Sequence, residues 1–403
     1  MLVSSNSSLQ PTMLRLTATS VTVTGGHQLL GGKLSSDSPF FLCDCRTLET
    51  KPLTEEQEPS GQTSDKILAV AFSSSGKYCA VTDDRKRLIL FQAEPSWEKI
   101  SVRFVSRRCT AIAFSPCESR ILVADKSGDV YSFLVDTPLE EGHLELGHLS
   151  MLLDVVVTPD GRFVITCDRD EKIRVSLSEA PHIIQSFCLG HTEFVSQLLV
   201  LPGSDNLLLS GSGDGTLRLW RYDSGEEIHC WTLSDVPRLG HDREVKMFAV
   251  SKLTSSPDVE HVAVLCDSVS GIFLFSVSSD FHLAHPQYIS LPYVPLDVDF
   301  ESSTSLWVLA DEKESPVELY GLTDGVWQPA PQDKFMKRLA ETIQDNWEGL
   351  EESKSSENKF SGLYKTLCDN MASYMVKKEA RLQAEKRKFT SLQSDSALKA
   401  PKI

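Results

Sequence analysis

The chain has 403 residues with 40 basic and 56 acidic side chains, a formal net charge of −16. It contains no apolar run of about 18 residues and no basic, apolar signal at its start, so neither a membrane span nor a secretory leader is expected. A body this acidic is a poor ligand for nucleic-acid phosphates by itself, and it suits a basic partner protein.

The first part of the chain gives only weak structural signals. Residues 1–13 have no regular pattern and are expected to be disordered. An alternating run over 14–24 and the apolar segment 40–45 predict strands, and the polar, acidic segment 50–65 predicts a long loop. The pattern that organises the chain begins only after this loop.

From residue 67 onward the sequence repeats itself. Four strand-like stretches end at Phe91, Phe133, Ser176 and Trp220, at intervals of 42, 43 and 44 residues. An interval of about 40–45 residues is typical of the four-stranded blades of a β-propeller. Two Gly-His pairs that lie 43 residues apart give the same register. The sequence therefore predicts an all-β chain built from WD-type blades.

The clearest blade covers 190–220. It contains Gly-His, three apolar strands, and the turns Pro-Gly-Ser-Asp-Asn and Gly-Ser-Gly-Asp-Gly between them. Four polar groups can be buried in such a blade because each finds a hydrogen-bond partner. We expect this buried set to consist of His191, Ser210, Asp214 and Trp220.

Blade counting gives a closed ring. Further strand-like stretches end at Phe275 and Tyr320, which brings the number of candidate blades to seven. A ring leaves only short, protected edges if its first and last blades share strands. We therefore predict a seven-bladed WD-repeat β-propeller over 14–325, in which 14–24 supplies the strand that completes the last blade.

After the propeller the apolar period becomes that of helices. Two such segments, the second beginning at Phe360, predict a helical extension over 334–376. A basic tail over 377–403 follows and is expected to be disordered. The cations in its first part are Lys377, Lys378, Arg381, Lys386, Arg387 and Lys388.

The chain has none of the motifs of an enzyme. No metalloprotease, nucleophile-elbow or phosphate-loop pattern occurs, and the glycine-rich segment 211–215 lies inside a hairpin instead of before a helix. Ten cysteines lack the paired spacing of zinc ligands. We predict a non-catalytic recognition protein with no metal and no cofactor of its own.

Two neighbouring turns carry a mixture of charges. Lys126 lies in the turn of blade three, and the next blade alternates cations with carboxylates around its own turn. Turns at equivalent positions of adjacent blades lie close together, so the two predict a polar docking face. The residues concerned in blade four are Asp168, Arg169, Asp170, Lys172 and Arg174.

Several segments together resemble one protein family. They are RCTAIAF, LVADKSGDVYSF, LELGHLSMLLDV, RDEKIRVS, SFCLGHTEFVS, GSGDGTLRLW and SGLYKTLCDNMASYMVKKEARLQ. These segments are similar to the WD-repeat non-catalytic subunit of the eukaryotic tRNA (guanine-N7)-methyltransferase. The resemblance is close from about 67 to 220 and weak over the first sixty residues and the last two blades.

The resemblance implies a scaffold that binds and stabilises a separate catalytic subunit as a heterodimer. That subunit would hold S-adenosylmethionine and methylate N7 of a guanosine in the tRNA variable loop, with tRNA bound through the complex and no membrane involved. The expected location is the nucleus, with the cytoplasm as a second site.

The same resemblance implies docking through Lys126, Asp170, Lys172 and Arg174, with Asp168 and Arg169 as adjacent candidates. Arg174 is expected to face a carboxylate of the catalytic subunit. The six tail cations are candidate tRNA contacts, or else a solvated helix end or a nuclear-import signal. The fold alone leaves other functions open: the substrate receptor of a ubiquitin ligase, or a chromatin or ribosome-assembly scaffold.

Overall fold

The structure is a computed structural model that describes residues 12–34, 38–49, 65–204, 206–237, 248–351, 360–365, 375 and 378. The chain divides into one unit over 1–364 and a second over 365–403. In the second unit, Met375 and Lys378 have helical backbone. The predicted loop over 50–64, the start of the chain and every tail cation except Lys378 lie outside the described residues.

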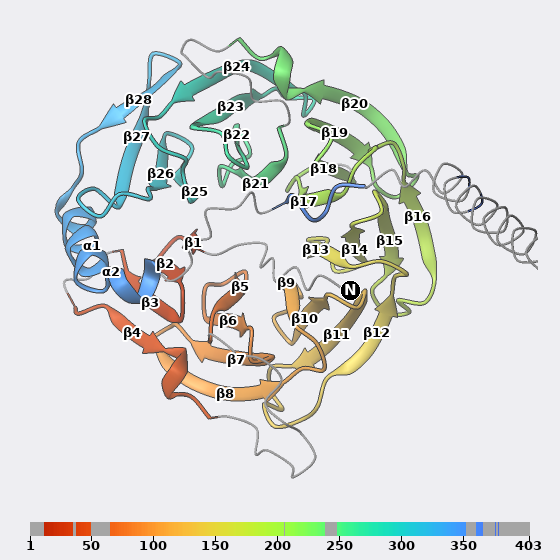
Figure 1. Ribbon diagram of the computed structural model, residues 1–403, viewed down its shortest axis with the longest axis horizontal. Helices are drawn as coiled ribbons and strands as arrows, with labels where there is room; N and C mark the ends of the chain where they lie inside the picture. Colours follow the sequence, from red (N-terminus) through yellow and green to blue (C-terminus); the bar gives the residue numbers. More distant parts are fainter. Residues whose placement is uncertain are drawn as a thin grey trace, which may run out of the picture. The chain divides into compact units, whose positions relative to one another are not determined.

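The first unit is a ring of seven four-stranded antiparallel sheets (Figure 1). Each sheet uses four consecutive strands, with the first innermost and the fourth outermost, and the inner strands of neighbouring blades contact one another. The prediction of a seven-bladed propeller is therefore confirmed.

The first four blades hold sixteen strands. They are β1 (Thr12–Leu16), β2 (Ser20–Gly25), β3 (Gln28–Lys33) and β4 (Phe41–Asp44); β5 (Ile67–Phe72), β6 (Tyr78–Asp83), β7 (Arg87–Gln92) and β8 (Glu98–Phe104); β9 (Cys109–Phe114), β10 (Arg120–Asp125), β11 (Asp129–Leu134) and β12 (His143–Gly147); and β13 (Leu152–Val157), β14 (Phe163–Asp168), β15 (Ile173–Leu177) and β16 (Ile184–Cys188).

The last three blades and the connections complete the unit. Their strands are β17 (Val195–Val200), β18 (Leu207–Ser212), β19 (Thr216–Arg221) and β20 (Glu226–Thr232); β21 (Val250–Ser255), β22 (His261–Cys266), β23 (Gly271–Val277) and β24 (Leu283–Ser290); and β25 (Asp297–Ser302), β26 (Ser305–Leu309), β27 (Val317–Thr323) and β28 (Val326–Ala330). Among its described residues, the helices are two 3-10 turns, η1 (Cys45–Thr47) and η2 (Leu233–Asp235), and two α-helices, α1 (Lys334–Asp345) and α2 (Trp347–Glu351).

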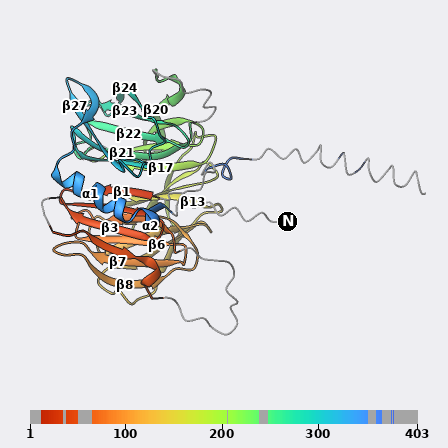
Figure 2. The same cartoon turned by 60° about the vertical axis from the view of Figure 1, so that its left-hand side comes forward.

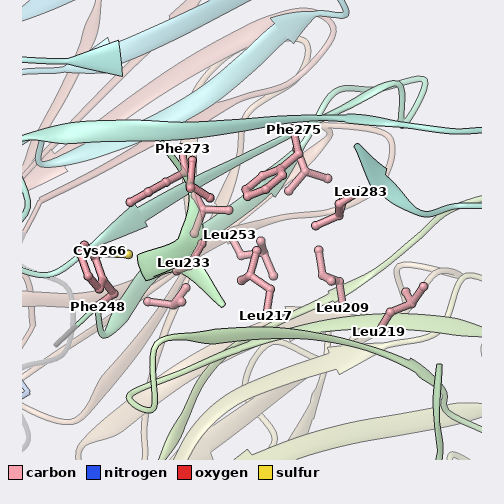
Figure 3. Close-up of a cluster of buried hydrophobic side chains, with 14 of the residues drawn as sticks. Leu209, Leu217, Leu219, Leu233, Phe248, Leu253, Cys266, Phe273, Phe275 and Leu283 are labelled. Carbon is pink, nitrogen blue, oxygen red and sulfur yellow. The ribbon is translucent and has the colours of Figure 1, made fainter. Parts of the chain in front are cut away.

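Apolar side chains fill the space between blades. The second strand of each blade is buried on both faces because a neighbouring blade packs against each side, and β18 accordingly has no exposed residue. Figure 3 shows the layer between blades five and six, where Leu209 and Leu217 face Phe273 and Phe275. A fully buried leucine or phenylalanine in such a layer contributes about 1.5–3 kcal/mol.

The ring closes differently from the prediction. Residues 14–24 do not complete the last blade, because they lie in β1 and β2, which pair with each other in the first blade. The last blade is completed by its own β28, which pairs with β27 and ends at Ala330, beyond the expected end of the propeller at 325. No strand among the described residues is shared between the two blades.

Side-chain carboxylates of β25 join the last blade to the first instead. Asp297 Oδ2 accepts a hydrogen bond from Leu14 N at 2.9 Å, and Asp299 Oδ2 accepts one from Leu16 N at 2.8 Å. Lys252 of blade six reaches the same Asp297 with Nζ 2.8 Å from Oδ1, and both side chains are 4% exposed. These bonds satisfy N–H groups on the inner edge of β1, where no neighbouring strand pairs with them.

The two C-terminal helices cover the same junction. Asp333 caps α1 by accepting a hydrogen bond from Met336 N at 2.7 Å. Leu339 and Ile343 are buried in one cluster with Leu30 of blade one and Trp307 of blade seven, and Figure 2 shows α1 and α2 beside the first blade. The first predicted helix thus packs on the propeller. Within the described residues, no helix is long and apolar enough to cross a membrane.

Candidate partner-binding face

The strand order puts two kinds of connection at opposite ends of each blade. In an antiparallel meander the second-to-third turn and the link to the next blade lie at one end, and the other two turns lie at the other end. We call the first end the upper face; in blades two to five it holds the turns 84–86, 126–128, 169–172 and 213–215. The opposite end is the lower face. Both predicted docking turns therefore lie on the upper face.

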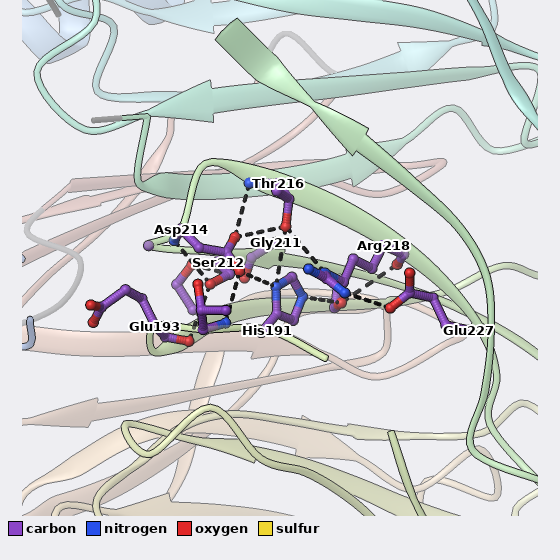
Figure 4. Close-up of polar contacts among 12 residues, drawn as sticks. His191, Glu193, Gly211, Ser212, Asp214, Thr216, Arg218 and Glu227 are labelled. Carbon is purple, nitrogen blue, oxygen red and sulfur yellow. Dashed lines mark hydrogen bonds and ion pairs between the residues drawn. The ribbon is translucent and has the colours of Figure 1, made fainter. Parts of the chain in front are cut away.

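The predicted buried set of blade five is assembled at the upper face, and Figure 4 shows two of its members, His191 and Asp214. His191 Nδ1 lies 2.9 Å from Asp214 Oδ2, and His191 Nε2 lies 2.8 Å from Ser210 Oγ. The Trp220 indole N–H donates to the same Ser210 Oγ at 2.8 Å, and Trp220 is 0% exposed. Ser210 therefore accepts from the indole and donates to the imidazole, whose other nitrogen donates to the carboxylate. The structure brings together all four residues.

The surroundings of this set explain the low pKa of Asp214 and the presence of glycine at position 190. Burial raises the pKa of the Asp214 carboxyl, but hydrogen bonds from His191, Thr216 and Thr192 outweigh it, so that the net pKa lies well below the usual value. Gly190 precedes the histidine because a Cβ there would lie 2.6 Å from Arg218 Nη1 and 3.0 Å from the Trp220 ring. These contacts are internal to the blade, and they hold the 213–215 turn in place.

Blade four has a different set of hydrogen-bonded polar side chains, although Ser176 stands in place of its tryptophan. His148 Nδ1 lies 3.0 Å from Asp168 Oδ2, and His148 Nε2 lies 2.8 Å from Thr166 Oγ1. The acidic member is thus Asp168, at the end of β14, and not Asp170, which the repeat aligns with Asp214. Asp168 is 2% exposed, so it is a structural residue of the turn and not a docking side chain.

Arg174 was expected to offer its guanidinium to a partner, and in this chain the guanidinium is bonded within blades three and four. Its Nε donates to Ser176 Oγ at 2.9 Å, Nη1 to Gly147 O at 3.0 Å, and Nη2 to Pro181 O at 2.8 Å. The residue is 9% exposed. The guanidinium therefore bonds with Ser176, the residue that replaces the blade-five tryptophan, and ties together three segments of blade four.

Four predicted docking residues remain accessible on the upper face. Arg169, Asp170 and Lys172 are exposed, and Lys126 is half-buried in the neighbouring turn. Asp168 Oδ1 fixes the blade-four turn by accepting from the N–H groups of Asp170 at 2.9 Å and Lys172 at 3.0 Å. The buried carboxylate thus fixes a turn whose exposed side chains alternate in charge. Such a turn suits a protein surface with its own mixed charges.

Lys126 lies beside another cation. Its backbone N–H donates to Arg108 O at 3.1 Å. Burial, and then the positive charge of Arg108, lower the pKa of the Lys126 ammonium group. A cation in this position is stabilised by an anionic partner.

A C-terminal segment that we did not place also lies on this face. Phe360 and Tyr364 pack on Phe194, with ring centroids 5.3 and 5.1 Å apart, and Tyr364 Oη donates to Gly213 O at 3.3 Å. Arg169 Nε donates to Leu363 O at 3.3 Å. The backbone over 360–364 forms turns, so the second predicted helix does not begin at Phe360. Phe360 and Leu363 are buried, and Phe194, against which Phe360 packs, is remote in sequence and could not be identified as the partner of this segment.

Two further predictions concern the basic tail and metal ligands. Lys378 is exposed, and the other five predicted tail contacts, Lys377, Arg381, Lys386, Arg387 and Lys388, lie outside the described residues. In the part of the chain that the structure describes, no group of three or more His, Cys, Asp or Glu side chains is placed to hold a metal ion.

Solved structures share the fold. A chain of the mitotic checkpoint complex crystal structure superposes with a TM-score of 0.61 at 15% identity, covering 79% of this chain and 91% of that one. The U3-55K structure gives a TM-score of 0.58 at 18% identity, covering 74% of this chain and 87% of that one. At these identities the likeness establishes the propeller architecture alone.

Sequence comparison is more specific. The family model of the tRNA methyltransferase TRM82 WD40 domain matches 33–143 and 135–323. A tRNA (guanine-N(7)-)-methyltransferase non-catalytic subunit of Xenopus laevis is 56% identical over 393 residues, 97% of this chain and 99% of that protein. The Homo sapiens protein of the same description is 46% identical over 369 residues, 90% and 89% of the two chains. The chain therefore belongs to the family of WD-repeat non-catalytic subunits of tRNA (guanine-N7)-methyltransferase.

Proposed function

We propose that this chain is the scaffold on which a separate catalytic subunit is held for N7-methylation of a guanosine in the tRNA variable loop. A family named for a non-catalytic subunit requires a second chain for the reaction. In this proposal the catalytic subunit binds S-adenosylmethionine, and the two chains form a heterodimer that receives tRNA. The names of the relatives do not favour the substrate receptor of a ubiquitin ligase.

The docking site is proposed on the exposed turn of blade four. Arg169, Asp170 and Lys172 alternate in charge on a turn whose backbone is fixed by the buried Asp168 carboxylate. A rigid turn loses little conformational freedom when a partner binds, so that its charges contribute more of their interaction energy to affinity. Lys126 extends the same face toward blade three.

The buried Arg174 side chain holds together the segments next to this turn. Arg174 bonds with Gly147 O and Pro181 O, and Gly147 ends β12 of the neighbouring blade. Its side chain therefore sets the position of blade three relative to the docking turn of blade four. Replacing Arg174 by Glu would place a carboxylate against two carbonyl oxygens, so it would disturb the blade as well as the interface.

A charge reversal on the exposed turn tests the proposal with little effect on the blade. Lys172→Glu should weaken binding of the catalytic subunit at least tenfold, because truncating a close interfacial charge pair costs about 2–5 kcal/mol. The matched control is Arg162→Glu, which reverses an exposed charge on the lower face of the same blade. Titration of labelled catalytic subunit against each purified chain gives the dissociation constants. Equal constants for Lys172→Glu and the unaltered chain would refute this docking turn.

A further inference from the structure

A group of cations lies on the upper face outside the proposed docking turn. Lys86 is in the turn between β6 and β7, and Arg107 and Arg108 are in the connection from β8 to β9. Val105 N donates to Lys86 O at 2.9 Å, and Lys126 N donates to Arg108 O at 3.1 Å, so the connection runs between the turns of blades two and three. We call Lys86, Arg107 and Arg108 the basic arc. Lys86 and Arg107 are exposed, and Arg108 is half-buried.

The segments that hold the basic arc have almost no acidic residues. Over 84–86, 105–108 and 126–128 there are five Lys or Arg residues and one carboxylate, Asp84. Asp84 is 8% exposed and accepts from Lys66 N at 3.1 Å, so its charge is directed into the blade. Arg85, by contrast, is paired with Asp65 at 2.5 Å and is not counted in the arc.

The lower face of the same blades has the opposite charge. Its turns in blades two and three, over 73–77, 93–97, 115–119 and 135–142, hold five Asp or Glu residues and one Lys residue. The two ends of these adjacent blades thus differ in sign on a chain whose net charge is −16. Such a difference directs a polyanion to the upper face and away from the lower one.

We propose that the basic arc binds the phosphate backbone of the tRNA while the catalytic subunit is docked on the adjacent turn of blade four. This inference rests on the proposed function. The charge pattern separates the two surfaces: the blade-four turn mixes cations with carboxylates, as a protein partner requires, whereas the arc offers cations alone. Phosphate groups need cations but no carboxylates, and they are bound without regard to base sequence.

The arc also adjoins the proposed docking site, since Arg108 is bonded through its backbone to Lys126. A tRNA that extends past the catalytic subunit over blades three and two would meet Arg108, Arg107 and then Lys86. The acidic scaffold would in this way supply a local positive surface next to the enzyme, and the rest of its surface would repel RNA that binds elsewhere.

The test compares two double variants of the full heterodimer. Lys86→Gln with Arg107→Gln removes two exposed cations of the arc, and Lys77→Gln with Arg162→Gln removes two exposed cations of the lower face. The probe is an unmodified tRNA transcript, and its affinity is measured from low to moderate salt. Each neutralised phosphate contributes about 0.7–0.9 to the slope of log affinity against log salt, so the arc variant should reduce the slope by about 1.5. The lower-face variant should bind as the unaltered complex does.

Three results would overturn the inference. An unchanged slope for the arc variant would show that these cations do not contact phosphates. An equal reduction for both variants would show that total charge, and not the arc, is responsible. Weakened assembly with unchanged tRNA binding by the assembled fraction would make the arc a protein interface. Failure of the unaltered chain to assemble with the catalytic subunit is a separate outcome, and it would refute the proposed function.

Discussion

Replacing Trp220 by Ala should produce one of the largest losses of stability available in a single blade. Its ring is fully buried among apolar side chains of blades four and five, and its N–H is bonded to Ser210 Oγ at 2.8 Å. Deleting a buried Trp side chain leaves a cavity and costs about 3–5 kcal/mol. Trp220→Phe keeps a six-membered ring but loses the N–H and three heavy atoms, so its cost combines one hydrogen bond with a smaller cavity, about 1–3 kcal/mol.

The equivalent position of blade four is the internal comparison. Ser176→Ala creates no large cavity, but it removes the acceptor of Arg174 Nε at 2.9 Å. The guanidinium keeps two carbonyl acceptors, so the expected loss is about 1–3 kcal/mol. From the sequence alone, where Ser176 only replaces an aromatic ring, the same substitution would be expected to cost little.

Urea unfolding followed by far-UV circular dichroism measures all three variants against the unaltered chain. The predicted order of destabilisation is Trp220→Ala first, with Trp220→Phe and Ser176→Ala both smaller. Equal losses for the two Trp220 variants would refute the cavity argument, since the ring would then contribute nothing beyond its N–H. A Ser176→Ala loss as large as that of Trp220→Ala would refute the assignment of equivalent positions in the two blades.

Three further predictions follow from the same contacts. The pKa of Asp214 is lowered in the folded state, so its ionised carboxylate stabilises the fold at pH values above the ordinary pKa of 3.8, and this contribution is lost as the pH falls below it. The melting temperatures of Asp214→Asn and the unaltered chain should therefore converge below about pH 4. A difference that stays constant with pH would contradict this. Lys252→Met leaves the Asp297 carboxylate buried without its cation and should cost about 3–5 kcal/mol in urea unfolding, with part recovered by adding Asp297→Asn; equal losses would argue against the ion pair. Truncation after Met375 should flatten the salt dependence of tRNA binding by the complex and leave heterodimer assembly intact, whereas superimposable salt titrations would exclude the tail from tRNA binding.

The repeat could be read from the sequence because each blade carries its own local signals. Gly190, His191, Asp214 and Trp220 occur within one blade, and their hydrogen bonds join strands that are adjacent in sequence. Regular intervals then located the other blades. The number of blades and the buried set of blade five therefore needed no information about distant contacts.

Closure of the ring could not be read in the same way. It depends on Asp297 accepting from Leu14, a contact across 283 residues with no local pattern. The expectation of a shared strand came from ring closure in general, and it failed because β28 supplies the fourth strand of the last blade and α1 covers the junction.

The sequence predicted a docking face from two neighbouring turns, and the structure places both turns on the upper face. The alignment of repeats makes Asp170 equivalent to Asp214. In the structure, however, the carboxylate that bonds with His148 belongs to Asp168, at the end of β14. Arg174 was expected on the docking face from its place in the charged segment of blade four, and its guanidinium bonds with Ser176, the residue that replaces the blade-five tryptophan. Spacing gives a residue's position on a strand but not the partner of its side chain.

We propose that this chain supports a methyltransferase without carrying out the reaction itself. The direct measurement is the initial rate of N7-methylguanosine formation on a tRNA transcript with S-adenosylmethionine, using the catalytic subunit alone, this chain alone, and the two together. The account predicts no product from this chain alone and a higher rate from the pair than from the catalytic subunit alone, with Lys172→Glu reducing that gain and Arg162→Glu preserving it. Product formed by this chain alone, or equal rates with and without it, would contradict the account.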